Sequence, residues 1–250
     1  MLDAECQEFG NIHLVVITLE LRANMTTIAE RLGAAAGRIA KAAQVAGRDP
    51  DSITLLAVSK RKPLEDVVAA LAQGQQAFGE NYVQEGVEKI QALAQQQPGA
   101  QVQWHLIGPL QSNKTAQVAQ YFDWVQSIDR AKIAKRLSEQ RPGHLKPIQI
   151  CIQVNISGEE SKSGVTPDAV LALAADIAGL PNVRLRGLMA IGSGAQQEFH
   201  SMKALFDQLK DSFPQVDTLS MGMSDDLEAA IMEGATLVRL GTAIFGARTN

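Results

Sequence analysis

The stretch Ile53-Thr54-Leu55-Leu56-Ala57-Val58-Ser59-Lys60 changes abruptly from apolar to polar at its end. Its first part is short and partly β-branched, which predicts a strand covered on both faces, as in a parallel sheet. Lys60 is then expected at the carboxyl end of a core strand, where parallel α/β folds collect their ligands. Desolvation favours a neutral amine, which can attack an aldehyde to form a Schiff base. The alternative is a surface lysine whose stem lies along apolar surface.

Strand and helix patterns alternate on both sides of this stretch. The expected strands are residues 53–58, 77–79, 102–107, 122–128, 148–156, 183–191, 218–220 and 237–240. The expected helices are residues 25–46, 63–74, 80–96, 112–120, 130–140, 166–177, 196–213 and 225–233. About eight strands, each adjacent to a helix, predict a single α/β domain, a parallel (β/α)8 TIM barrel with no second domain. A doubly wound open sheet is the alternative.

The composition is that of an ordinary globular protein, with 46% hydrophobic and 20% charged residues. The formal net charge is −4 and the lysines and arginines are scattered, so neither nucleic acid nor a membrane is expected as a partner. Cys6 and Cys151 have no metal-type spacing, and Cys151 falls in an apolar strand pattern, where it is expected to act as a small hydrophobe. This cysteine usage indicates a reducing cytoplasm.

The first residues differ from the rest of the chain. They include an apolar run that is too short to span a bilayer, preceded by acidic residues where a secretory signal would be basic. Thr27 and Glu30 have capping-box spacing at the head of an alanine-rich helix. We hypothesise that Met25 is the natural start, that residues 1–24 are a disordered or loosely docked extension, and that residues 25–250 form the barrel. Intact mass and amino-terminal sequencing of the native protein test this; residues 1–24 in that protein contradict it.

Small and hydroxyl residues follow the seventh and eighth expected strands. In barrel enzymes the loops at these positions commonly bind phosphate. Gly241-Thr242 is one such turn, and Ser224 belongs to the other. Ser224 could instead cap the next helix. The phosphate interpretation requires Asp225 and Asp226 to point away.

Arg239 lies two residues before Gly241. Residues two apart on a strand share a face, so the guanidinium is expected at the same mouth. Arginine can only donate hydrogen bonds, and opposite a pyridine nitrogen it would keep that nitrogen unprotonated. A pair with an acidic neighbour such as Glu233 is the equal alternative.

Other motifs predict less. Lys62 is expected to be solvated at a helix entry, and His105 to be a hydrogen-bonded residue inside the barrel rather than a general base. Residues 161–164 form a polar loop that could cover the mouth; the alternative is a loop that is only solvated. The sequence has no nucleophile elbow, no G-x-G-x-x-G after a strand and no cluster at metal-ligand spacing.

Several longer stretches resemble, in order, the motifs of the pyridoxal phosphate homeostasis protein family. They are Thr54-Leu-Leu-Ala-Val-Ser-Lys60, Phe78-Gly-Glu-Asn-Tyr-Val-Gln-Glu85, His105-Leu-Ile-Gly-Pro-Leu-Gln-Ser-Asn-Lys114, Ser161-Lys-Ser-Gly164, Gly187-Leu-Met-Ala190, Met221-Gly-Met-Ser-Asp-Asp226 and Arg239-Leu-Gly-Thr-Ala-Ile-Phe-Gly246. The match runs from about residue 25 to residue 248, and residues 1–24 have no counterpart in it.

The resemblance implies a barrel similar to the amino-terminal domain of alanine racemase, with pyridoxal 5′-phosphate (PLP) held as a Schiff base on Lys60. It implies that the cofactor phosphate lies around Ser224, Gly241 and Thr242. It also implies that Arg239 faces the pyridine nitrogen, and that Asn81 and Met223 lie near the ring. No metal is expected.

The function implied is non-catalytic PLP (vitamin B6) homeostasis, in which a cytoplasmic monomer buffers the cofactor or delivers it to PLP-dependent apo-enzymes and so influences amino-acid metabolism. The alternative is a weak racemase-like enzyme, and a third possibility is a regulator whose loaded face binds proteins. An unprotonated pyridine nitrogen is a poor electron sink, which favours the carrier. Related racemases add a β-rich domain that supplies a tyrosine; here Tyr82 and Tyr121 are the only tyrosines, and the chain ends at Asn250, soon after the last expected strand.

Overall fold

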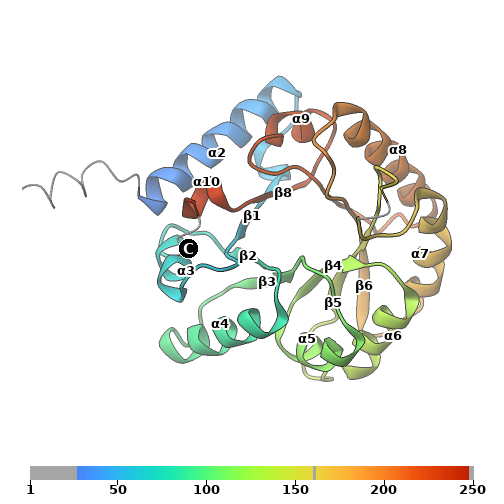
Figure 1. Cartoon of the computed structure of the whole chain (residues 1–250), viewed down its shortest axis with the longest axis horizontal. Helices are drawn as coiled ribbons and strands as arrows, with labels where there is room; N and C mark the ends of the chain where they lie inside the picture. Colours follow the sequence, from blue (N-terminus) through green and yellow to red (C-terminus); the bar gives the residue numbers. More distant parts are fainter. Residues whose placement is uncertain (1–26, 160–161, 248–250) are drawn as a thin grey trace, which may run out of the picture.

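Eight parallel strands close into a barrel in the computed structural model, which describes residues 27–159 and 162–247 (Figure 1). The strands are β1 (Thr54–Val58), β2 (Ala77–Glu80), β3 (Gln103–Leu106), β4 (Trp124–Ile128), β5 (Ile148–Gln153), β6 (Val183–Met189), β7 (Thr218–Ser220) and β8 (Leu237–Leu240). Each pairs with the next, and β8 pairs with β1 from Thr54↔Leu237 to Ala57↔Leu240. The predicted single TIM barrel is confirmed, and the open-sheet alternative is wrong because the sheet closes.

Helices surround the barrel (Figure 1). They are α2 (Ile28–Val45), α3 (Leu64–Leu71), α4 (Val83–Gln96), α5 (Thr115–Tyr121), α6 (Ala131–Gln140), α7 (Val170–Ala178), α8 (Gln196–Ser212), α9 (Leu227–Met232) and α10 (Thr242–Phe245), with 3-10 turns at Pro50–Ser52, Ser112–Lys114 and Pro167–Ala169. The capping box is present: the Thr27 hydroxyl accepts from the Glu30 amide at 3.2 Å, and the Glu30 carboxylate accepts from the Thr27 amide at 2.7 Å. This pair sets the start of α2.

Alternation along β1 divides its side chains between two clusters. Leu56 and Val58 pack with Ala77, Ile107 and Leu237 in a cluster that contains no helical residue, so it lies inside the barrel. Ala57 belongs instead to the large cluster between strands and helices. Because Lys60 continues the even-numbered series of Leu56 and Val58, this alternation directs it toward the barrel interior.

Several elements differ from their expected bounds. β5 ends at Gln153 rather than at residue 156, because Val154 makes only an isolated bridge to Val165. α9 begins at Leu227, and the short α10 after β8 was not expected. The hypothesis on residues 1–24 falls outside the described residues, as do Cys6 and Ser161 of the polar loop. Among the described helices, none is long and apolar enough to cross a membrane.

Candidate functional site

A cavity of about 590 Å³ opens at the carboxyl end of the strands, and we call it the mouth cavity. Its lining includes all the residues that the sequence singled out for a cofactor: Lys60, Asn81, Met223, Ser224, Arg239, Gly241 and Thr242. Arg38, Val58, Ile107, Ile191, Asp225 and Ala243 complete the lining. A volume of this order is typical of small-molecule sites. Residues from both ends of the chain therefore meet at one mouth.

Lys60 stands on a tight turn directly after β1. It is half-buried, and the preceding Ser59 is buried on the opposite side of the strand end. Arg61 has φ 58°, a left-handed conformation that is uncommon outside glycine. The Lys62 amide donates to the Ser59 carbonyl at 3.1 Å and closes the turn. The structure places Lys60 in the lining of the mouth cavity, and its role as the cofactor anchor stays a prediction.

A buried charged network, which we call the Lys89 clamp, holds the backbone on both sides of Lys60. Lys89 Nζ donates to the Ser59 carbonyl at 2.7 Å, to Glu80 Oε1 at 2.8 Å and to Glu85 Oε1 at 2.7 Å. Glu85 Oε1 also accepts from the Arg61 amide at 2.5 Å, and the Ser59 hydroxyl donates to Glu80 Oε1 at 2.7 Å. Burial raises the pKa of Glu80, and the attraction of Lys89 opposes that rise. The clamp therefore fixes the position from which Lys60 projects.

The sequence context predicted a solvated Lys62, but its ammonium group is bound to the protein. Its ammonium donates to the carbonyls of Phe245 and Ala247, both at 2.9 Å. Cations commonly satisfy the last carbonyls of helices in this way. Lys62 thereby ties the end of α10 to the turn that carries Lys60.

The loop after β7 presents Ser224 to the mouth cavity. Ser224 is not a helix cap, since α9 begins at Leu227 with Asp226 at the N-cap position, so that alternative is wrong. The Asp226 carboxylate accepts from the Met223 amide at 2.5 Å and shapes the loop. Asp225 lines the cavity, so the condition that both aspartates point away is not met. Arg38 also lines it and donates to the Ser224 carbonyl at 2.9 Å.

Gly241 and Thr242 join β8 to α10 on the other side of this loop. A Cβ at Gly241 would lie 3.3 Å from the Val58 carbonyl oxygen. The absence of a side chain therefore lets the end of β8 lie close to the end of β1. This brings the Thr242 hydroxyl and Lys60 to the same cavity.

Arg239 is a buried cation on β8, 4% exposed. Its Nη1 donates to the Ser220 hydroxyl at 2.8 Å, and its Nη2 donates to the Ala190 carbonyl at 2.7 Å. Burial lowers the pKa of Arg239 to about 10, so it stays protonated near neutral pH. The alternative pair with Glu233 is wrong, because that carboxylate binds Gln196 and His200 instead. Among the described residues, no carboxylate forms an ion pair with Arg239.

Asn81 provides an observation that points to a ligand. Its Oδ1 is buried and has no hydrogen-bond partner within the described residues, although Asn81 lines the cavity. Buried polar atoms are nearly always paired, so this atom fits the donor of a bound molecule. Gly108 allows the close approach beneath it, since a Cβ there would lie 2.1 Å from the Asn81 carbonyl oxygen. Met223 is 38% exposed at the rim.

His105 is a hydrogen-bonded residue inside the barrel, as predicted. Its Nδ1 lies 2.9 Å from Gln126 Nε2, and its ring stacks on Trp124 with centroids 4.9 Å apart. Burial lowers the pKa of His105 to about 3, so the ring is neutral. Cys151 is buried beside Trp124 and Met189 and acts as a small hydrophobe, also as predicted.

The tyrosines lie outside the mouth cavity. The Tyr121 hydroxyl accepts from Gln91 at 2.7 Å, and the Tyr82 hydroxyl accepts from Arg61 at 3.0 Å. Neither residue is part of the cavity lining. Within residues 27–159 and 162–247, no cluster of histidine, cysteine or carboxylate groups could hold a metal ion.

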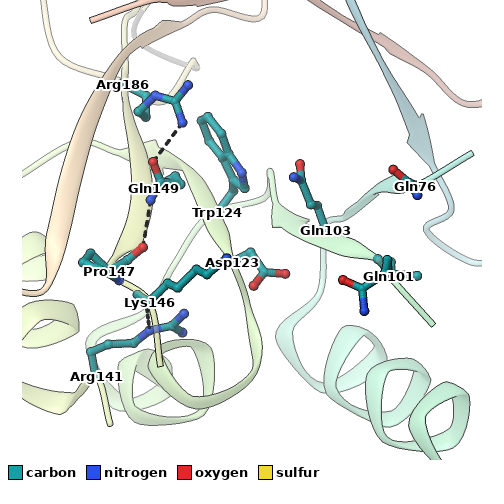
Figure 2. A pocket seen from close by; sticks show the side chains of 11 residues that line it. Gln76, Gln101, Gln103, Asp123, Trp124, Arg141, Lys146, Pro147, Gln149 and Arg186 are labelled. Carbon is teal, nitrogen blue, oxygen red and sulfur yellow. Dashed lines mark hydrogen bonds between the residues drawn. The ribbon is translucent and has the colours of Figure 1, made fainter. Parts of the chain in front are cut away.

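A second cavity, of about 420 Å³, lies at the opposite end of the barrel, where β3, β4 and β5 begin (Figure 2). Its arginines are already engaged. Arg186 binds Gln149 and Asp217, and Arg141 donates to backbone carbonyls, including that of Lys146. Figure 2 shows the bond from Arg186 to Gln149 and the bond from Arg141 to the Lys146 carbonyl. The amino-terminal ends of barrel strands usually serve stability, so the mouth cavity is the better candidate site.

The fold and site define a barrel of the alanine racemase type: the family model "Alanine racemase, N-terminal domain" matches residues 31–249. The chain is 53% identical over 230 residues to the pyridoxal phosphate homeostasis protein of Vibrio alginolyticus, covering 90% of this chain and 99% of that protein. It is 51% identical over 230 residues to the protein of the same name from Escherichia coli K12, covering 90% and 98%. The chain therefore belongs to the family of pyridoxal phosphate homeostasis proteins.

Solved structures agree with this assignment. PipY of Synechococcus elongatus PCC7942, solved with PLP bound, matches with a TM-score of 0.73 and 35% identity, covering 88% of this chain and 100% of that chain. An alanine racemase of Clostridium difficile 630 matches with a TM-score of 0.65 and 12% identity, covering 86% of this chain and 56% of that one. The second likeness shows the fold alone.

Proposed function

We propose that this chain binds PLP reversibly in the mouth cavity and acts in vitamin B6 homeostasis, buffering the cofactor or delivering it to apo-enzymes rather than catalysing a reaction. One observation carries the proposal. In a chain whose relatives are named for pyridoxal phosphate homeostasis, one cavity is lined by a lysine, by a buried arginine that forms no ion pair within the described residues, and by an orphaned asparagine oxygen.

Each group has a distinct role in this proposal. The Lys60 amine bonds to the cofactor aldehyde carbon, and the carbonyl oxygen leaves as water. Ser224, Gly241 and Thr242 would hold the phosphate. Asp225 also lines the cavity, and Arg38, whose guanidinium is bound by Glu228, attracts Asp225 and so offsets its negative charge beside the phosphate. When bound, the cofactor supplies an electrophilic aldehyde and an electron-accepting ring.

Arg239 makes the ring a weak electron acceptor in this proposal. It can only donate a hydrogen bond, so opposite the ring nitrogen it keeps that nitrogen unprotonated. Asn81 and Met223 would lie near the ring. A weak electron sink suits a carrier better than a racemase.

Three observations favour the carrier. The relatives are named as homeostasis proteins rather than enzymes. Neither tyrosine lines the cavity, so the acid or base of a racemase would have to come from elsewhere. Ile191 and Met223 are part-exposed at the mouth, so the cavity is open to solvent rather than sealed against it.

The proposal includes a monomer that acts in the cytoplasm and hands PLP to apo-enzymes. Light scattering of the loaded protein tests the oligomeric state. A transfer assay tests the handover: apo-enzyme activity should recover when loaded protein is added and free PLP is trapped. If apo-enzyme activity does not recover although the protein still binds PLP, the result favours a buffering role or a regulator whose loaded face binds proteins.

The first experiment compares the wild type with Lys60→Ala and with a control, Lys135→Ala, whose lysine is exposed and lies outside the cavity. With PLP, the wild type and the control should show a visible Schiff-base absorption band. Reduction with borohydride should then attach the cofactor permanently, and mass spectrometry should locate it on Lys60. The band should vanish in Lys60→Ala. A band that persists in Lys60→Ala contradicts the assignment of the anchor. Substantial racemisation that depends on Lys60 would make the protein an enzyme.

A further inference from the structure

A chain of hydrogen bonds crosses the barrel interior from the mouth cavity, and we call it the Arg239 relay. Arg239 Nη1 donates to the Ser220 hydroxyl at 2.8 Å, which lies 2.7 Å from Gln126 Oε1; Gln126 Nε2 in turn lies 2.9 Å from His105 Nδ1. The members come from β8, β7, β4 and β3 and are all buried. Only Arg239 lines the mouth cavity.

The chemistry of arginine fixes the direction of every bond in the relay. Since Arg239 can only donate, the Ser220 oxygen accepts from it, and the single hydroxyl proton goes to Gln126 Oε1. The Gln126 amide nitrogen must then donate to His105 Nδ1. The His105 proton is therefore on Nε2, an atom with no partner among the described residues.

The relay explains how the Arg239 guanidinium keeps one orientation without a carboxylate. Its described partners, the Ser220 hydroxyl and the Ala190 carbonyl, are neutral and hold two different nitrogens. A carboxylate at either place would form a bidentate or charge-assisted pair and would cancel the positive charge. The neutral partners fix the plane of the guanidinium. Asp226 attracts the guanidinium but forms no ion pair with it among the described residues, so the charge is not cancelled by a directly bound carboxylate.

We infer that Ser220 and Gln126 are positioning residues, which hold the Arg239 guanidinium in register with the ring nitrogen of the bound cofactor. Neither residue lines the mouth cavity, so they would act only through Arg239. This inference rests on the proposed function. It predicts that the relay sets the affinity for PLP and the pH at which the Schiff-base absorption changes.

Two variants break the relay at successive links. Ser220→Ala removes the hydroxyl that Arg239 Nη1 binds, and PLP affinity should fall about tenfold, the equivalent of one hydrogen bond to a charged group. Gln126→Met keeps the bulk of the side chain but frees the Ser220 hydroxyl to turn, so the fall should be smaller, about threefold. In both variants the pH midpoint of the absorption change should move in the same direction.

Ser138→Ala is the matched control, because Ser138 is also buried and its hydroxyl also accepts a hydrogen bond, from the Asn182 amide, but it lies on α6. It should lower the melting temperature of the cofactor-free protein without moving affinity or pH midpoint. If the relay variants change only the melting temperature, as Ser138→Ala does, the inference is overturned. If Ser220→Ala does not fold, Gln126→Met tests the inference by itself: a change in PLP affinity and pH midpoint supports it, and a change in melting temperature alone overturns it. A wild type with no Lys60 adduct refutes the proposed function instead.

Discussion

His105 is a buried neutral imidazole whose titration should be visible in the stability of the protein. Burial lowers its folded pKa to about 3, whereas an exposed histidine titrates near 6.5. As pH falls through 6.5, the unfolded chain takes up a proton that the folded chain refuses. The contribution of His105 is therefore complete above pH 6.5 and is lost progressively toward pH 3.

Urea unfolding at pH 7.5 and 5.5 measures this loss. His105 alone should lower the free energy of unfolding by about 1.4 kcal/mol between these pH values. His105→Gln keeps an acceptor for Gln126 and should remove that part of the pH dependence. His144→Gln, which removes an exposed histidine, should keep the wild-type difference. Equal losses in the wild type and His105→Gln would show that the folded protein protonates His105.

The position of a site residue was predictable where the residue follows a strand. Lys60, Arg239 and Gly241 could be placed at one mouth because parallel strands end on the same side of a barrel. Arg38 could not, since it comes from α2, where only apolar spacing is informative. The structure also overturned the cap interpretation of Ser224, because a serine before two aspartates fits a helix start whether the helix begins there or three residues later.

The Lys89 clamp joins β1, β2 and α4, and we expect it to be a major part of the stability at this corner of the barrel. Lys89→Met should lower the free energy of unfolding by about 3 kcal/mol, because Glu80 and Glu85 lose the cation between them and Glu80 is fully buried. Schiff-base formation should also slow, since the backbone around Lys60 loses its anchors. Stopped-flow absorbance and urea unfolding measure the two effects.

Lys203→Met is the control for the clamp. Lys203 forms an ion pair with Asp207 that has the same four-residue spacing as Lys89 and Glu85, but both partners are exposed. Exposed pairs of this kind contribute little, so this variant should stay close to the wild type in stability and in rate. In the double variant Glu80→Gln/Lys89→Met the buried charge is gone, and part of the stability should return. A Lys89→Met protein as stable as Lys203→Met would contradict the role of the clamp.

Most elements were predictable because their apolar spacing is long enough to read. α10 was missed, since four residues cannot show a helical period. The extra residues assigned to the end of β5 are apolar but leave the sheet after Gln153, where Val154 meets Val165 in the following loop. In α10 and in the residues after β5, apolar side chains predict burial correctly. They do not predict the type of element, because the residues that bury them lie elsewhere in the chain.

The whole barrel divides into an end that binds and an end that stabilises. Within the part of the chain that the structure describes, the mouth cavity holds a buried arginine that forms no ion pair and an asparagine oxygen that has no hydrogen-bond partner. At the opposite end, Arg141 donates to the carbonyls of Ala119, Phe122 and Lys146, so its donors serve the fold. The orphaned asparagine oxygen at the mouth and the satisfied Arg141 donors at the other end predict that ligand binding and basal stability respond to different substitutions.

Thermal and urea unfolding with and without PLP test this division. At a PLP concentration one hundred times the dissociation constant, binding to the folded state alone should stabilise the wild type by about 2.7 kcal/mol. Arg141→Gln should lower the basal stability by about 2 kcal/mol, because it leaves buried carbonyls unpaired, and yet keep the full increment from PLP. Lys60→Ala should lose most of the increment. An increment that disappears in Arg141→Gln would mean that the two ends of the barrel are coupled, or that PLP binds at the end shown in Figure 2.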